Sequence, residues 1–468
     1  MSVVFLLSVV LKGVGALLEV LLQVLITREM GVSGYGTYAA WINAADLVFW
    51  VFFSGLVKCN TFYLSGENAV CIHTFKKRYY LRYVLPLLTA ASAGLLLGKK
   101  FPMVVVLLIT GLELLVLDRS STLLARGRMV TSLVGEYVLG RLVLVAGVIV
   151  LTAVGQLQLK TLLILYLAQY VLILSFFLLR GGKTLCTSGD ISDEVSLKKW
   201  TAYQQADLMH AMIEQMPVVV QYFFVGAFET GVVSIVLLVK KLINFISGPT
   251  AKVFLPEFSR LYHAGDRKKI YSCYAAIMRI QMLIVGPMAV VLLGYPRVVL
   301  GILAGELVDY AWLFMLCAVV FLLSSSLGPC GGILQMTGNE KTDNRCRMAA
   351  LLTMVLTMVL TMVLTGRDPY FVLYGLCAET LLEAGGKYAY VCRWMEHPPV
   401  RLGTYLKWWF VPCLAIAATY LFGVQSSFVW MLLMAGGVFV LGLVKELGES
   451  GDYSLGKFKR GMEKRGHE

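Results

Sequence analysis

The chain has 468 residues, of which 58% are hydrophobic and 15% are charged, and its mean hydropathy is +0.77. Soluble domains carry about 25% charged residues, so this composition excludes a soluble enzyme, and its hydrophobicity excludes a disordered chain. The formal net charge of +13 comes from short basic clusters between apolar runs. That distribution is typical of loops beside anionic lipid headgroups and does not indicate nucleic-acid binding. We therefore expect an all-α polytopic membrane protein.

Apolar stretches long enough to cross a bilayer as helices recur along the whole chain. The first of them, Val3–Thr27, is too long for the apolar part of a signal peptide and has no basic start, so we expect it to remain as a span. The sequence predicts fourteen spans: Val3–Thr27, Gly36–Val57, Tyr80–Gly98, Pro102–Leu124, Val130–Val154, Thr161–Leu179, Gln205–Phe228, Gly231–Leu255, Ser272–Leu293, Ala311–Met336, Met348–Thr365, Tyr370–Val391, Tyr405–Phe422 and Phe428–Val444.

The loops differ strongly in their content of lysine and arginine. Loops after even-numbered spans, together with the C-terminal tail, hold 31 of the 41 basic residues, and loops after odd-numbered spans hold six. Because basic residues accumulate on the cytoplasmic side, we expect both termini to be cytoplasmic and the protein to be a multi-pass protein of the inner membrane. One missed span would exchange the sides of every later loop and remove this alternation.

Two glycine turns indicate an internal repeat. Residues 31–36 and residues 226–231 both read Gly-x4-Gly, at an offset of 195. The same offset pairs charged residues of the spans, namely Lys12 with Asp207, Glu19 with Glu214 and Asp46 with Lys241. Transporters are often built from duplicated bundles, and six spans in each copy make the repeat a parallel one.

The repeat predicts a division of the chain into five parts. Two six-helix bundles form its two copies, and two additional helices stand outside the repeat. The expected parts are residues 1–180 as the N-terminal bundle, 181–204 as a cytoplasmic linker, 205–393 as the C-terminal bundle, 394–444 as helices 13 and 14, and 445–468 as a basic cytoplasmic tail.

Polar stripes run along the first and seventh spans. Lys12 and Glu19 lie on one face of the first, and Asp207 and Glu214 lie on one face of the seventh, which Pro217 interrupts. A charge at the bilayer centre costs about 2.5–3.5 kcal/mol on insertion scales, so we expect both stripes to face a shared cavity between the halves. The alternative is that these residues form a purely structural cluster of salt bridges.

Further basic residues lie inside other spans. Lys240 and Lys241 are adjacent near the middle of span eight, so only one of them is expected to face the cavity. No carboxylate lies one turn away on the same helix, which favours a mobile anion as their partner. Arg141 in span five has Glu136 five residues before it and could be paired or could extend toward the membrane surface.

Other polar residues indicate structure rather than chemistry. Glu379, Glu383 and Lys387 are spaced by four in span twelve and can close an ion pair on one helix face. The ten cysteines include no C-x-x-C pair, and the histidines in the loops lack metal-ligand spacing. No nucleotide-binding or hydrolase motif is present. We therefore expect no metal, no cofactor and no enzymatic activity.

Five short motifs, in order, resemble those of the bacterial polysaccharide flippases, which share a superfamily with the lipid II flippases and the multidrug and toxin extrusion transporters. The resemblance covers most of residues 5–345. The motifs are Arg28–Tyr38 (REMGVSGYGTY), Glu214–Gly226 (EQMPVVVQYFFVG), Phe254–Ser259 (FLPEFS), Leu303–Ala311 (LAGELVDYA) and Gly332–Lys341 (GILQMTGNEK).

The resemblance implies an alternating-access carrier that moves a polyprenyl diphosphate-linked oligosaccharide from the inner to the outer leaflet, for surface polysaccharide or cell-wall assembly. A polysaccharide polymerase is a possible partner. Fourteen spans match the lipid II flippases, whereas many oligosaccharide flippases have twelve, so the span count does not choose the substrate. The alternatives are a cation-coupled multidrug exporter of the same superfamily and a membrane scaffold of a glycan-assembly complex.

The resemblance also implies a cationic central cavity that receives the diphosphate. Lysine is a competent phosphate partner as a point charge, and the acids of the spans could bind a coupling proton or sodium ion. The candidate substrate-binding residues are Lys12, Lys240, Lys241 and Arg141, and the candidate coupling residues are Glu19, Asp46, Asp207 and Glu214.

Overall fold

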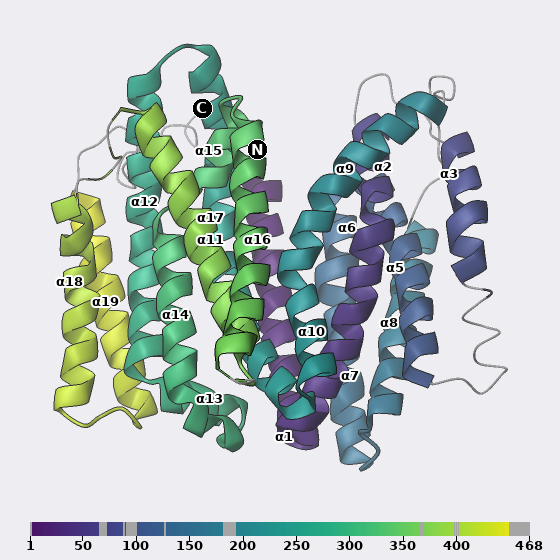
Figure 1. Ribbon diagram of the computed structural model, residues 1–468, viewed down its shortest axis with the longest axis horizontal. Coiled ribbons are helices and arrows are strands. Elements are labelled where there is room, and N and C mark those ends of the chain that lie inside the picture. The colour runs from purple at the N-terminus through teal and green to yellow at the C-terminus, as the bar shows by residue number, and fades with distance from the viewer. Residues whose placement is uncertain are drawn as a thin grey trace. The chain divides into compact units, whose positions relative to one another are not determined.

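The computed structural model describes residues 2–64, 73–87, 89, 101–125, 128–180, 193–365, 368–396, 398, 400 and 402–448. Within these ranges every regular element is a helix, as Figure 1 shows. Eight of the described helices or helix groups are long and apolar enough to cross a membrane. The expectation of an all-α polytopic membrane protein is confirmed.

The described chain forms two compact units, Met1–Ser234 and Ile235–Glu468. The helices of the first unit are α1 (Ser2–Phe52), α2 (Ser54–Leu64), α3 (His73–Tyr79), η1 (Tyr80–Val84), α5 (Phe101–Ala125), α6 (Met129–Leu133), η2 (Val134–Leu139), α7 (Gly140–Ala153), α8 (Leu159–Arg180), α9 (Asp193–Glu214) and α10 (Met216–Phe224). Helix α11 (Ala227–His263) passes from the first unit into the second.

The second unit continues with α12 (Arg267–Ala289), η3 (Val290–Gly294), α13 (Pro296–Leu303), η4 (Gly305–Tyr310), α14 (Ala311–Ser326), α15 (Cys330–Met336), α16 (Glu340–Leu364), α17 (Phe371–Trp394), α18 (Leu402–Leu421) and α19 (Phe428–Gly448). Thirteen of the fourteen expected spans coincide with these helices and those of the first unit. The remaining one, Tyr80–Gly98, lies largely outside the described residues. Helix α9 begins at Asp193, so part of the expected linker 181–204 is helical, and the five-part division stays a prediction.

The first two expected spans are joined by one kinked helix. Helix α1 has 51 residues and changes direction at Gly31, where φ is 71° and ψ is 171°. A side chain is strained in that conformation, so glycine is required at the kink. The sequence placed a turn at residues 31–36, and the structure places the break at its first residue.

The two Gly-x4-Gly turns pack against each other within the first unit. A Cβ atom on Gly36 would overlap the carbonyl oxygen of Ala227, and one on Gly231 would overlap the carbonyl oxygen of Val32. Each turn therefore uses its last glycine to admit the backbone of the other turn. The two turns that indicated the repeat in the sequence thus contact each other directly, and the repeat itself stays a prediction.

Helix α16 has one buried face and one exposed apolar face. Met354 and Met358 are buried, whereas Leu352, Leu356 and Val363 are each more than 60% exposed. The hydroxyls of Thr353 and Thr361 donate to carbonyls four residues earlier and so keep no unsatisfied donor on the apolar surface. An apolar outer face of this kind is what a lipid environment requires.

Candidate functional site

A cavity of about 360 Å³ lies inside the first unit. Segments of α1, α2, α5, α6, η2 and α9 surround it. Two basic and two acidic residues, Lys12, Lys58, Glu136 and Asp207, contribute to its wall. The volume lies within the range of about 300–1,000 Å³ that is typical of small-ligand sites.

A break between α1 and α2 fixes the position of α9 beside the cavity. The backbone N–H of Gly55, just after the break at Phe53, donates to the side-chain oxygen of Gln204 at 2.9 Å. The side-chain amide of Gln204 donates to the carbonyl of Val51 at 2.7 Å. The Gln204 side chain thus supplies the hydrogen-bond partners that the Gly55 N–H and the Val51 carbonyl lack at the helix break.

One turn further along both helices, Lys58 forms an ion pair with Asp207. The aspartate side chain is 4% exposed and that of Lys58 is 48% exposed. The first carboxylate oxygen of Asp207 accepts from Lys58, and the second is buried with no hydrogen-bond partner among the described residues. Since an unsatisfied buried carboxylate oxygen is costly, Asp207 is poised to receive a further donor or cation from the cavity.

Lys12 reaches the same cavity from α1. Its ammonium lies 5.5 Å from the centre of the Tyr137 ring, and its charge also acts on Glu136. Both residues belong to η2, a π-helical turn, and such turns are frequent at functional sites. A Cβ on Gly15 would lie 2.7 Å from the carbonyl oxygen of Tyr137, so glycine at this position lets α1 approach η2 closely.

A second polar cluster surrounds Arg141 within the first unit. The guanidinium Nε lies 2.7 Å from Oε2 of Glu19, and Tyr166 also hydrogen-bonds Arg141. Gln23 donates to Glu19 at 2.9 Å and accepts from the Tyr35 hydroxyl at 2.6 Å. Of the two alternatives left open for Arg141, the structure shows the paired one, with Glu19 as the partner.

Two more acids belong to the neighbourhood of this cluster. Glu113 on α5 interacts electrostatically with Asp46 and with Arg141. Glu214, by contrast, is the last residue of α9 and does not line the cavity. The structure therefore brings Lys12 and Asp207 to one cavity and groups Glu19, Asp46 and Arg141, while Glu214 is not among the residues that line the cavity.

The charged residue of this cavity that the sequence did not single out is Lys58. The second expected span ends at Val57, so the sequence predicts a loop at Lys58. Helix α2 in fact continues to Leu64. The sequence signal that could have identified Lys58 is its position directly after the last apolar residue of the span. A lysine there can place its ammonium at the membrane boundary while its aliphatic side chain packs along the apolar helix.

The two lysines of α11 have different environments in the second unit. Lys240 is buried, lies 3.5 Å from Oε2 of Glu379 on α17 and faces the Phe321 ring at 5.8 Å. Lys241 is exposed. A fixed carboxylate from another helix is therefore present beside Lys240, where the sequence favoured a mobile anion, and the role of Lys240 in substrate binding stays a prediction.

A compact charge network joins α16 to α17. Lys387 lies 2.6 Å from Oδ1 of Asp343 and also pairs with Glu383 four residues earlier, as the sequence predicted. Arg347 lies 3.5 Å from Glu383, and Gln335 donates to Asp343 at 2.9 Å. In the part of the chain that the structure describes, no group of three or more His, Cys, Asp and Glu residues is placed to hold a metal ion.

Neither protein-family models nor curated protein sequences match the chain. Solved structures do match it. The lipid II flippase MurJ in an inward closed conformation shares 14% identity over 94% of this chain and 99% of its own, with a TM-score of 0.68. An inward-facing multidrug resistance transporter of the MATE family, in the MOP superfamily, shares 12% identity over 84% of this chain and 98% of its own, with a TM-score of 0.60.

A MATE structure in the bent conformation gives a TM-score of 0.55 at 12% identity, over 83% of this chain and 93% of its own. The chain therefore has the fold shared by these flippase and multidrug-transporter structures. These structural neighbours are transporters and not enzymes. At such low identities the likeness establishes the fold, and the substrate has to be argued from the site.

Proposed function

We propose that the protein is an alternating-access flippase that moves a polyprenyl diphosphate-linked oligosaccharide from the inner to the outer leaflet of the cytoplasmic membrane. The observation that carries this proposal is the cavity of the first unit, because Lys12 and Lys58 both line it and the chain has the fold of a transporter. A diphosphate carries negative charge that two ammonium groups can neutralise as point charges.

The ion pair between Lys58 and Asp207 gives the cavity an internal counter-charge. In the proposed cycle the diphosphate replaces Asp207 as the partner of Lys58. The released carboxylate then binds a proton or a sodium ion, which couples the substrate to an ion gradient. Such an exchange keeps both the half-exposed ammonium of Lys58 and the buried carboxylate of Asp207 paired throughout the cycle.

The acids of the Arg141 cluster are assigned to coupling in this proposal, and Arg141 itself remains a candidate for substrate binding. Glu19 and Asp46 are the acids in its neighbourhood, and Arg141 holds Glu19 directly. Lys240 and Lys241 remain candidates for the sugar or phosphate in the second unit, where Glu379 is the competing partner of Lys240. Glu214 remains a coupling candidate at the end of α9.

The proposed setting is glycan assembly. The uneven distribution of basic residues supports an inner-membrane location with both termini in the cytoplasm. Delivery of a lipid-linked oligosaccharide to the outer leaflet would supply a polysaccharide polymerase or a cell-wall synthase. The two-copy arrangement of residues 1–180 and 205–393 is part of the same proposal.

The test is flipping in liposomes that hold a fluorescent lipid-linked sugar. We expect the Lys12→Gln/Lys58→Gln variant to flip the sugar at least about tenfold more slowly, because a hydrogen bond to a charged group contributes about 1.5–3 kcal/mol. The matched control is Lys160→Gln/Lys341→Gln, which removes two exposed lysines elsewhere. An unchanged rate in the cavity variant would overturn the diphosphate role, and no flipping by the native chain would favour a scaffold.

A cation-coupled multidrug exporter is the second candidate. The same cavity has acidic and aromatic walls, from Glu136, Asp207, Trp50 and Tyr137, and such walls suit an organic cation. A drug-efflux assay in a hypersensitive host separates the two functions. Resistance that is lost in Asp207→Asn and retained in the Lys12→Gln/Lys58→Gln variant would favour the exporter over the flippase.

A further inference from the structure

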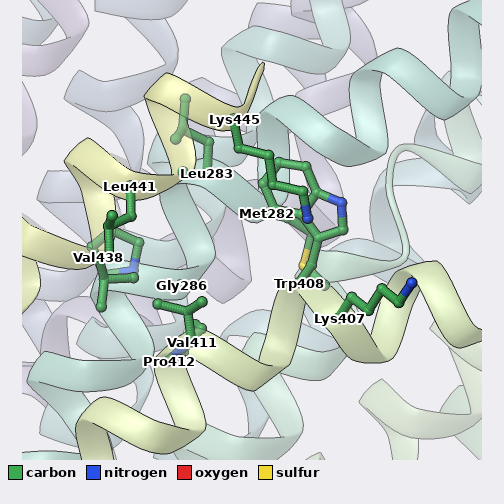
Figure 2. A pocket seen from close by; sticks show the side chains of 12 residues that line it. Met282, Leu283, Gly286, Lys407, Trp408, Val411, Pro412, Val438, Leu441 and Lys445 are labelled. Carbon is green, nitrogen blue, oxygen red and sulfur yellow. The ribbon is translucent and has the colours of Figure 1, made fainter. Parts of the chain in front are cut away.

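A narrow groove lies between α12, α18 and α19 in the second unit, far along the chain from the cavity described above (Figure 2). Its enclosed part is about 50 Å³. Its walls are apolar along most of their length, and Leu283, Gly286, Pro412, Val438 and Leu441 contribute to them. A Cβ on Gly286 would lie 3.1 Å from Pro412, so the absence of a side chain keeps this part open.

One end of the groove is basic and aromatic. The ammonium of Lys445 lies 4.2 Å from the centre of the Trp408 ring. Figure 2 shows these two side chains beside each other, and Lys407 precedes Trp408 on the same helix. Trp408 is only 8% exposed, yet its indole N–H has no hydrogen-bond partner among the described residues. A buried donor of this kind is normally satisfied, so the groove offers it to a ligand.

The charges of Lys407 and Lys445 can interact with a ligand in the groove. Both are exposed, and within the described residues neither forms an ion pair. The carboxylate next to Lys445 in sequence, that of Glu446, is fully buried and lies 3.3 Å from Arg279 on α12. The Glu446 carboxylate therefore pairs with Arg279 and not with Lys445, so the end of the groove carries a positive charge.

The positions of these residues along α18 and α19 match the headgroup and hydrocarbon layers of a bilayer. Trp408 lies six residues after the start of α18, and Lys445 lies three residues before the end of α19. At 1.5 Å per residue these are depths of about 9 Å and about 5 Å from the helix ends. Val438 lies about 15 Å from the end of α19 on the same scale. The basic end is thus at headgroup depth and the apolar part extends toward the hydrocarbon.

The outer surface around the groove is apolar as well. Leu406 and Phe410 on α18 and Leu433, Val440 and Leu441 on α19 are each more than 50% exposed. A surface of this kind faces lipid tails, so a ligand that enters the groove comes from the bilayer rather than from solution.

We infer that this groove binds one anionic glycerophospholipid, at the leaflet where α18 begins and α19 ends. The lipid phosphate contacts Lys407 and Lys445 and accepts from the Trp408 indole, and one acyl chain lies along Gly286 and Val438. Basic pockets between membrane helices bind anionic headgroups in this manner, and tryptophan is suited to the boundary between headgroup and hydrocarbon. The bound lipid joins α18 and α19 to α12, and this role does not depend on the transported substrate.

The test is native mass spectrometry of the full chain released from nanodiscs of phosphatidylglycerol or of phosphatidylcholine. We expect the native chain to retain one phosphatidylglycerol and the Lys407→Gln/Lys445→Gln variant to lose about thirtyfold in affinity for it. Retention of phosphatidylcholine is expected to be weak in both. The matched control, Lys268→Gln/Lys341→Gln, removes two exposed lysines of the same unit outside the groove.

Two variants that keep the charge distinguish the groove from general attraction to the surface. Leu441→Trp changes an exposed wall residue, so it is expected to fold while it blocks the acyl chain, and Trp408→Phe removes only the donor and part of the ring. Both are expected to lower retention of phosphatidylglycerol. Unchanged retention in the double lysine variant, or an equal loss in the matched control, would overturn the assignment. Displacement by glycerol phosphate, which has no acyl chains, would also overturn it.

Discussion

The two units of the protein place charges inside the membrane in different ways. In the first unit, Lys12, Lys58 and Asp207 surround a cavity of about 360 Å³, and one oxygen of the aspartate has no hydrogen-bond partner among the described residues. In the second unit, Lys387 contacts both Asp343 and Glu383 directly. The first arrangement leaves room for a ligand, whereas the second uses its charges to hold α16 against α17.

The largest expected effect is on the second arrangement. Replacing Lys387 with methionine would leave the buried Asp343 and the partly buried Glu383 beside a neutral side chain. Breaking a buried pair in this way costs about 3–5 kcal/mol, so we expect the variant to unfold at a markedly lower temperature in detergent. Thermal unfolding followed by circular dichroism measures this, and a change of less than about 1 kcal/mol would show that the network is not a structural clamp.

The next largest expected effect is that of disturbing the contact between the two Gly-x4-Gly turns. Gly231→Ala places a methyl group against the carbonyl oxygen of Val32, and overpacking of this kind costs about 1–3 kcal/mol. The control is Gly13→Ala, because nothing lies within 4 Å of a Cβ at that position. Alanine there is expected to be neutral or stabilising. Equal effects of the two substitutions on unfolding temperature would contradict the proposed close contact.

Lys58 tests whether the first unit is built for a ligand. Its side chain is half exposed, so Lys58→Gln is expected to cost about 1 kcal/mol or less in stability. The proposed transport function requires a much larger loss of flipping rate in the same variant. If stability and transport fell together in this variant, Lys58 would instead be a structural residue like Lys387.

The smallest expected effect comes from an exposed pair. Asp266 caps α12, because its side chain accepts from the backbone N–H of Lys269 and lies 2.8 Å from that residue's ammonium. The hydrogen bonds to Lys269 lower the pKa of Asp266. Its contribution is therefore present at neutral pH and is lost as the pH falls through the lowered value. Asp266→Ala should reduce the unfolding temperature slightly at neutral pH and not in acid.

Much of the fold follows from the sequence. The apolar stretches fix where helices lie, since a membrane span has to satisfy its backbone internally, and the turn at residues 31–36 was located by its glycines. The pairing of Glu383 with Lys387 follows from helix periodicity alone.

The partners that join different helices did not follow from the sequence. Periodicity shows which residues share a face of one helix, but it does not show which helix packs against that face. For that reason Glu379 was not expected as the partner of Lys240, nor Arg141 as that of Glu19. The boundary of span two also hid Lys58, because hydropathy falls at a lysine even where the helix continues.

Because Gln204 is fixed by its hydrogen bonds, the cavity depends on the number of residues that separate Gln204 from Asp207 in α9. This residue is bound to the backbone at the break between α1 and α2, and Asp207 follows it by three positions. Insertion of one residue between them would rotate everything beyond by about 100°. The carboxylate would then swing away from Lys58 although no side chain had been altered. Length in this short stretch is thus as tightly constrained as residue identity.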